Sequence, residues 1–315
     1  MKAIHRILLV LLLIAGLVAV SCQQKPEGTK GTEEKRLNAV ASLFPLYDFA
    51  RNIARDRAEI TLLLPPGVEP HSFEPKPGDI VRLSKTDMLI YTNEYMEPWI
   101  DDILKGVANK DLLVIDSSKG ISLIKETEKK GHDDEQGRVR VDPHVWLDFS
   151  NAVIMVDNIL EGLIKKDPAN TEFYRNNAAA YKAQLKALDE KFEKTLSGCK
   201  KKIFINGGHF TFGYLARRYH LKYLSAYGFS PNAEPSPREL AALSAQLKRH
   251  GLKHIFYEEL ITPRVARTIA GETGASLLML HGAHNISREE FERGTTFLDL
   301  MEKNLENLKV GLQCQ

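Results

Sequence analysis

Short apolar runs that alternate with amphipathic stretches are the feature that most limits how this chain can fold. In the first half, the runs typical of buried strands are separated by stretches typical of helices; the strands are expected at 37–44, 58–64, 87–92 and 111–116, and the helices at 46–55, 79–85 and 98–107. A similar series starts at Lys202, with strands expected at 202–206, 221–226, 253–259 and 275–280, and helices from Thr211, over 236–250, from Pro263 and over 287–308. Such alternation predicts crossover connections and mostly parallel sheets. We therefore expect an α/β fold with two lobes.

Residues 150–197, between the two series, contain no strand pattern. Pro168 divides this segment, and apolar and aromatic residues at helical spacing over 172–196 predict one long helix. A helix of roughly 26 residues would be about 40 Å long at ~1.5 Å per residue. A continuous connector of this length should limit hinge bending. We expect an N-terminal lobe at 37–168, a rigid linker helix at 169–197 and a C-terminal lobe at 198–315.

The first residues have the layout of an export signal. Lys2 and Arg6 accompany an apolar run that is shorter than the ~20 residues needed to span a membrane, which predicts a signal peptide over 1–21. The sequence up to Cys22 resembles a bacterial lipobox, which implies that this cysteine is lipidated; an ordinary signal followed by an incidental cysteine is the alternative. The polar residues of 22–36 predict a flexible tether. We therefore expect an exported protein, anchored by lipid to the outer face of the cytoplasmic membrane or located in the periplasm.

The charge balance and the remaining cysteines fit such a compartment. Removal of 1–21, which takes away two basic residues and no acidic one, leaves 43 − 2 = 41 basic against 41 acidic residues. This balance argues against a nucleic-acid partner, which would require a basic surface. Cys199 and Cys314 are the two cysteines left after Cys22, so an oxidising environment would favour a disulfide between them, with two free thiols as the alternative.

Four histidines occupy loops in comparable places. His71 follows a predicted strand, His144 precedes the first linker helix, and His209 and His281 follow strands of the second lobe. In open α/β sheets, ligands bind beyond the carboxyl ends of strands. A single histidine in such a loop is more often a hydrogen-bonded residue than a metal ligand, but four of them in comparable places favour a metal site. Imidazole suits zinc, and four protein ligands in a tetrahedron describe a closed binding site.

Several segments around these histidines resemble a known family. They are "PPGVEPHSFEP", "DPHVWLD", "GGHFTFGYLARRY", "EPSP" and "IFYEELITPRVARTIAGETGA". Together they resemble the zinc and manganese solute-binding lipoproteins that serve metal ABC importers, from about residue 37 to the end. The resemblance implies two α/β lobes joined by a rigid helix, with the ion held between them by His71, His144 and His209.

The fourth ligand departs from the family pattern. Where many members have an aspartate in a segment resembling Leu-Asp-Pro-Leu, this chain has Leu280, His281, Gly282 and Ala283. His281 is therefore expected as the fourth ligand, and His284 is a second candidate. Glu258 resembles a family glutamate, and we expect it to hold a ligating histidine or to close the interface between the lobes.

The expected function is that of a monomeric receptor that captures Zn²⁺ and delivers it to a membrane permease of an ABC importer. An all-nitrogen set of ligands favours Zn²⁺ over Mn²⁺, although a manganese or other divalent-metal receptor stays open as an alternative. A secreted zinc hydrolase is disfavoured, because no HExxH, GxSxG or P-loop motif is present. Nothing in the sequence indicates an adhesin. His132 lies in a charged insertion that predicts a solvated loop rather than a metal-capturing one.

Overall fold

The computed structural model describes residues 36–125, 141–229, 235–260 and 262–315. The predicted signal peptide, Cys22, the tether before Arg36 and His132 lie outside these residues. None of the described helices is both long and apolar enough to cross a membrane. Residues 37–315 form one compact unit, which contains both lobes.

The first lobe is built on a four-stranded parallel sheet with the order β2-β1-β3-β4. Its strands are β1 (Leu37–Ala41), β2 (Ala58–Leu62), β3 (Met88–Tyr91) and β4 (Leu113–Asp116). Its helices are α2 (Phe44–Ala54), α3 (Pro77–Leu83) and α4 (Ile100–Gly106). Proline occupies the first turn of both α2 and α3, where its missing N–H removes no helical hydrogen bond.

The second lobe repeats this topology, with a parallel sheet of the order β6-β5-β7-β8. Its strands are β5 (Ile203–Asn206), β6 (Lys222–Ser225), β7 (His254–Tyr257) and β8 (Ser276–Met279). Its helices are α7 (Gly213–Arg218), α8 (Pro237–Arg249) and α9 (Arg264–Thr273). The prediction of two α/β lobes with parallel sheets is confirmed.

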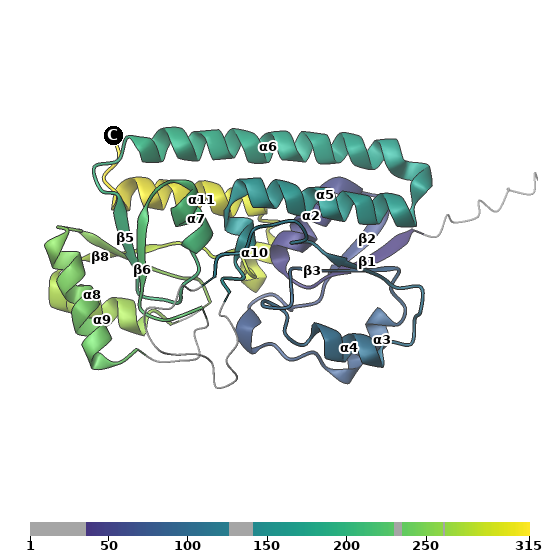
Figure 1. The fold of residues 1–315 in the computed structure, drawn as a ribbon, viewed down its shortest axis with the longest axis horizontal. Coiled ribbons are helices and arrows are strands. Elements are labelled where there is room, and N and C mark those ends of the chain that lie inside the picture. The colour runs from purple at the N-terminus through teal and green to yellow at the C-terminus, as the bar shows by residue number, and fades with distance from the viewer. Residues whose placement is uncertain (1–35, 126–140, 230–234, 261) are drawn as a thin grey trace, which may run out of the picture. The chain divides into compact units, whose positions relative to one another are not determined.

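Two antiparallel helices connect the lobes. They are α5 (Phe149–Lys166) and α6 (Thr171–Ser197), separated by the turn Pro168–Asn170. Figure 1 shows α6 extending past the helices of both lobes, and it packs against α2, α5 and α11. The predicted long helix is confirmed at 27 residues.

One hydrophobic core continues through both lobes. Successive residues of a strand point to opposite faces of the sheet. Thus Ala39 and Phe204 face the core shared with α2, α5, α6 and α11, while Val40 and Ile205 face the other side of their sheets. There, α3 and α4 cover the first sheet, and α8 and α9 cover the second. The two sheets are therefore joined by a common apolar layer.

The single C-terminal helix predicted over 287–308 is wrong. The structure has two helices, α10 (Arg288–Glu292) and α11 (Phe297–Gly311). Gly294 between them has a φ of 74°, which a helix cannot contain. Thr296 then caps α11 by accepting a hydrogen bond from the amide of Asp299, so a new helix starts at this point.

A disulfide joins Cys199, just after α6, to Cys314, next to the C-terminus. The two cysteines are 115 residues apart in sequence. The bridge attaches the end of the chain, which follows α11, to the end of the linker helix.

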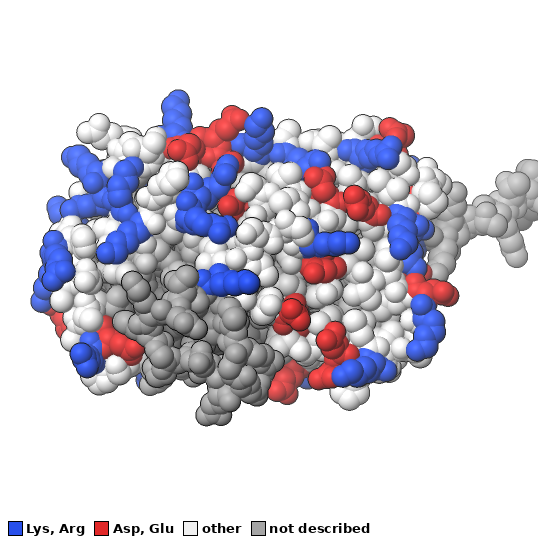
Figure 2. Space-filling model, viewed as in Figure 1, with Lys and Arg blue, Asp and Glu red and all other residues white. Residues whose placement is uncertain are grey.

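Charged side chains are distributed unevenly over the view in Figure 2. Basic and acidic side chains are interspersed over much of this face, while basic ones predominate over the end of the second lobe. The exposed residues Lys202 and Lys222 lie at the amino ends of β5 and β6. Since ligands bind at the carboxyl ends of parallel strands, these two lysines lie at the opposite end of the sheet from any such site.

A buried carboxylate connects the linker helix α6 with α2 and α11. Asp48 on α2 accepts hydrogen bonds from the hydroxyl of Tyr181 on α6 and from the amide of Phe297 at the start of α11, each at 3.1 Å. Burial raises the pKa of Asp48 to about 6, because the hydrogen bonds only partly offset the loss of hydration. Folding therefore makes the protonated form of the Asp48 carboxyl more favourable than it is in the unfolded chain.

We predict that Asp48 makes the protein less stable as the pH rises from about 4 to above about 6. The pKa is higher in the folded state than in the unfolded chain, so the stability contributed by protonation is complete at low pH and lost above the folded pKa. One pKa unit corresponds to about 1.4 kcal/mol, so the dependence should amount to about 3 kcal/mol. The Asp48→Asn variant keeps an acceptor oxygen and cannot ionise. Denaturant unfolding of both proteins across this range should show the wild type losing stability relative to the variant; a constant difference would contradict the prediction.

Candidate metal centre

The topology places two potential ligand sites at equivalent positions, one in each lobe. The strand order reverses between β1 and β3 in the first sheet and between β5 and β7 in the second. The loops that follow such a pair of strands run to opposite sides of the sheet and leave a crevice where ligands bind. In the first lobe, Glu97 fills this position: it accepts hydrogen bonds from the hydroxyl of Ser42 and from the amides of Thr92 and Asn93. In the second lobe, the corresponding loops carry His209 and two glutamates.

His71 lies in the loop after β2 and is the partly exposed member of the histidine group. The preceding glutamate, Glu69, caps the short turn Pro70–Ser72 by accepting hydrogen bonds from the amides of His71 (3.0 Å) and Ser72 (2.8 Å). Pro70 fixes the backbone on one side of the histidine. The loop therefore presents His71 from a restrained turn.

His144 is fully buried just before α5. Asp142 accepts a hydrogen bond from the amide of His144 at 3.0 Å, and the same oxygen lies 2.8 Å from Nδ1 of the ring. A carboxylate on one ring nitrogen fixes the orientation of the imidazole and makes the other nitrogen a better metal ligand. Nε2 of His144 is thus the nitrogen available to an ion.

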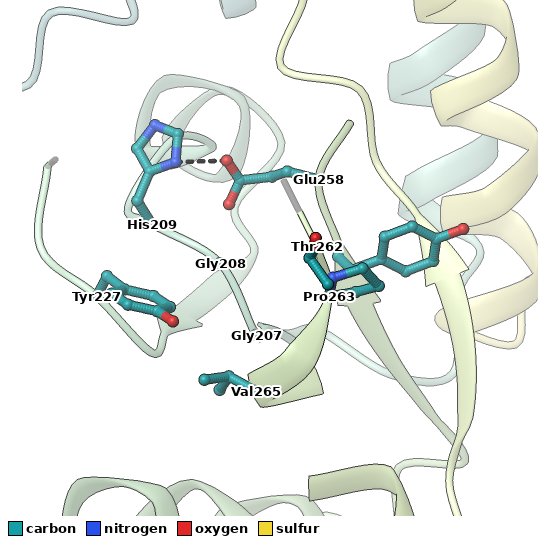
Figure 3. A pocket seen from close by; sticks show the side chains of 9 residues that line it. Gly207, Gly208, His209, Tyr227, Glu258, Thr262, Pro263 and Val265 are labelled. Carbon is teal, nitrogen blue, oxygen red and sulfur yellow. Dashed lines mark ion pairs between the residues drawn. The ribbon is translucent and has the colours of Figure 1, made fainter. Parts of the chain in front are cut away.

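His209 comes from the loop after β5, and its Nδ1 pairs with Glu258 at the end of β7 (Figure 3). Glu258 is held in turn by the side-chain amide of Asn206 at 2.6 Å and by the hydroxyl of Thr211 at 3.2 Å. Gly208 makes this approach possible, because a Cβ at that position would overlap the Glu258 carboxylate. The pair is therefore built into the backbone of the loop.

A small cavity of about 40 Å³ adjoins this pair. Figure 3 shows Glu258 directed toward His209 above the glycines of the loop. The cavity has room for about one water molecule beside the carboxylate. Its lining consists of Gly207, Gly208, His209, Tyr227, Tyr257, Glu258, Thr262, Pro263 and Val265.

The fourth imidazole is that of His284, in the loop after β8. Its Nδ1 lies 3.4 Å from Oε1 of Glu259, and its buried Nε2 has no hydrogen-bond partner among the described residues. Gly282 leaves space for the ring, because a Cβ there would overlap the imidazole. An unpaired, buried ring nitrogen is costly unless something binds it.

These four histidines converge. One potential ligand atom from each of His71, His144, His209 and His284 can be chosen so that all lie within 4.8 Å of one another. Nε2 of His144 is 3.3 Å from Nε2 of His71 and 3.2 Å from Nε2 of His209. Three of the four rings are buried, so a cation in this group would be largely shielded from water.

The structure brings together three of the four expected ligands and places His284, the alternate candidate, with them in place of His281. His281 lies in the same loop, but Asn304 on α11 binds both its backbone nitrogen (2.7 Å) and its backbone oxygen (2.8 Å). Its ring is directed to the loop's own backbone, to Glu259 and toward Glu290 on α10. Its position after a strand and in the place of the family aspartate predicts His281 as a ligand, but the contact with Asn304 fixes its backbone and its ring lies outside the group of four.

Two contacts of the candidate site were not predicted from the sequence. Asp142 and Glu259 pair with His144 and His284, as Glu258 does with His209. For Asp142, the position two residues before a histidine is a usable sequence signal. Glu259 and His284 are 25 residues apart, so no local pattern connects them.

The protonation of the rings follows from burial and from their neighbours. Burial, followed by the repulsion of the neighbouring imidazoles, holds the pKa of His71 and of His144 well below the usual value. Burial also acts to lower the pKa of His209, but the Glu258 carboxylate and more distant acidic groups outweigh it and raise the pKa. At neutral pH, His71 and His144 are therefore neutral, which is the form that binds metal. Four nitrogen donors in a buried group are chemically suited to a borderline divalent cation.

Comparisons with known proteins agree with this arrangement. Residues 39–311 match the family model described as zinc-uptake complex component A, periplasmic. The high-affinity zinc uptake system protein ZnuA of Bacillus subtilis is 36% identical over 300 residues, which cover 94% of each chain.

Solved structures share the fold. The metal-dependent lipoprotein YcdH from Bacillus subtilis is 37% identical with a TM-score of 0.75, over 88% of this chain and 99% of that one. The Zn(II)-bound ZnuA-like domain of Streptococcus pneumoniae AdcA is 32% identical with a TM-score of 0.75 and the same coverage. The predicted family resemblance is confirmed: the chain belongs to the family of periplasmic zinc-uptake component A proteins.

Proposed function

We propose that this protein is an exported receptor that binds Zn²⁺ between its lobes through His71, His144, His209 and His284. The observation that carries the proposal is the convergence of these four imidazoles from four separate loops. In three of them, a carboxylate lies at the ring nitrogen Nδ1, so the ion would bind Nε2. This is the usual arrangement of zinc-ligating histidines. At His209, whose Nε2 lies 2.8 Å from the hydroxyl of Thr211, the ion would replace that contact.

The partly exposed side of the site indicates how the ion enters. His144, His209 and His284 are buried, whereas His71 is partly exposed. We infer that zinc meets His71 first and then passes to the three buried rings. The ion is cargo, so it leaves by the same side when the receptor meets its membrane partner.

We infer a transport role rather than catalysis. A catalytic zinc site keeps an open coordination position for water, whereas four protein ligands close the coordination shell. Here the fourth imidazole, His284, occupies the place that a reactive water would need. Hydrolysis of ester or peptide substrates in proportion to bound zinc would contradict this inference.

The proposed partner is the permease of an ABC importer, to which the receptor delivers zinc as a monomer. The permease must contact the loops at the carboxyl ends of both sheets, because the histidines lie there. Lipidation of Cys22, followed by the tether, would keep the receptor at the membrane surface. This anchor is a proposal from the sequence, supported by relatives such as the zinc-binding lipoprotein AdcA of Streptococcus pneumoniae.

Competitive metal titration of a soluble form starting at Gln23 tests the site. The wild type should have one tight zinc site with much weaker manganese binding, because nitrogen ligands suit zinc better. The His284→Ala variant should lose more affinity than the about 10–100-fold typical for a residue that only supports a ligand. His250→Ala, at the end of α8, is the matched control and should bind zinc like the wild type. Equal affinity of the wild type for the two metals, or an unaffected His284→Ala variant, would contradict the proposed site.

The glycine beneath Glu258 provides a second test. A methyl group at position 208 would displace the carboxylate from His209, so Gly208→Ala should weaken zinc binding about 10–100-fold. Gly271→Ala, in α9 of the same lobe, is the control, because nothing lies near the added methyl group. Isothermal titration should separate the two variants; the same affinity in both would mean that the contact between Glu258 and His209 does not support binding.

A further inference from the structure

We propose that His281 is a positioning residue: its ring holds the turn of residues 281–284 in the conformation that presents His284 to the ion. This inference rests on the zinc site proposed above. It assigns a role to a buried histidine that lies beside the ligands without joining them.

The backbone of His281 is fixed on the side of α11. The side chain of Asn304 accepts a hydrogen bond from the amide of His281 and donates one to its carbonyl. These two bonds fix the orientation of the peptide groups of His281. With the backbone held in this way, the ring lies against the backbone of its own loop. His281 is only 2% exposed, so a hydrogen bond to its ring has to come from within the protein.

One such partner is the backbone two residues further along. Nδ1 of His281 accepts a hydrogen bond from the amide of Ala283 at 3.0 Å. Aspartate and asparagine make the same contact, from side chain to the amide two residues later, in turns of this kind. Ala283 has a φ of 58°, an unusual conformation for a residue with a side chain. The bond from His281 thus supports a strained position directly before His284.

The rest of the turn is held in the same way. Glu259 accepts a hydrogen bond from the amide of Gly282 at 2.7 Å, and its other oxygen lies next to Nδ1 of His284. The indole of Trp146 donates to the carbonyl of Gly282 at 2.8 Å. Without the hydrogen bond from its amide to His281, Ala283 would have no side-chain contact to hold its unusual conformation between Gly282 and His284. The expected consequence is a displaced His284 and weaker zinc binding.

Direct ligation by His281 makes a different prediction. Its Nδ1 accepts from the amide of Ala283 and lies 3.4 Å from Oε1 of Glu259, and its Nε2, which has no hydrogen-bond partner among the described residues, lies 3.9 Å from a carboxylate oxygen of Glu290 on α10. Neither ring nitrogen belongs to the group of four. A ligand could not be replaced by an amide side chain without loss, whereas a positioning acceptor could be.

Two amide variants of different reach test the proposal. In His281→Asn, the side-chain oxygen can accept the hydrogen bond from Ala283, as asparagine does in such turns, so zinc affinity should stay close to that of the wild type. In His281→Gln, the extra methylene moves the acceptor away, so affinity should fall about 10–100-fold. Zinc competition titrations of the soluble form give the affinities. Visible spectra of the Co²⁺-loaded proteins should show the same four-nitrogen coordination in the Asn variant and the wild type.

Each outcome separates this role from the others. An equal, large loss in both variants, with an altered Co²⁺ spectrum, would identify His281 as a ligand and overturn the proposal. Unchanged affinity in both variants would also overturn it, even if the metal-free proteins unfold at a lower temperature, because the residue would then be merely structural. A wild type without a tight zinc site would instead refute the proposed function itself.

Discussion

The hydrogen bonds between the loop after β8 and the loops of the first lobe hold the proposed metal centre together. The carbonyl of His284 accepts from the amide of Phe44, and the carbonyl of Ile286 accepts from the amide of Gly67. Between them, the side chain of Asn285 donates to two carbonyls of the loop after β2, at 2.7 and 2.9 Å. A segment that leaves the second sheet is thereby attached to the first lobe. The position of His284 relative to His71 depends on this attachment.

The attachment makes the four histidines unequal. His71 and His284 are tied to the same loops of the first lobe, and His144 precedes α5, which packs against β3 and β4. His209 is held by the second sheet through Glu258, and His284 is held by both lobes, because its Nδ1 lies next to Glu259 after β7. Any movement of that sheet away from the first lobe would withdraw His209 and Glu259, the partner of His284, from His71 and His144. The shared core beneath α6 restricts such movement to small displacements.

Much of the fold could be predicted from the sequence because its periodicity is local. Apolar runs identified both sheets, and helical spacing identified α6, since each signal lies within a few residues. The fourth imidazole could not be identified in this way. His281 and His284 occupy the same loop, and the choice between them depends on Asn304, a contact with a residue 23 positions away. The break between α10 and α11 at Gly294 was a local signal, but it was overlooked.

The distribution of oxygen and nitrogen around the site explains why zinc should be preferred. Three carboxylates, those of Asp142, Glu258 and Glu259, lie next to the histidines of the site. Their oxygens would favour a harder cation such as Mn²⁺ if they were available as ligands. Each one, however, is already engaged with a ring nitrogen, and Glu258 is also held by neighbouring amide and hydroxyl groups. To ligate Mn²⁺ through the oxygen that pairs with a ring nitrogen, a carboxylate would have to release its histidine, which would lose the orientation that the site requires. The carboxylate contacts that orient the imidazoles therefore also keep these oxygens from binding the metal. The preference for Zn²⁺ over Mn²⁺ and the orientation of the ligands thus come from the same contacts.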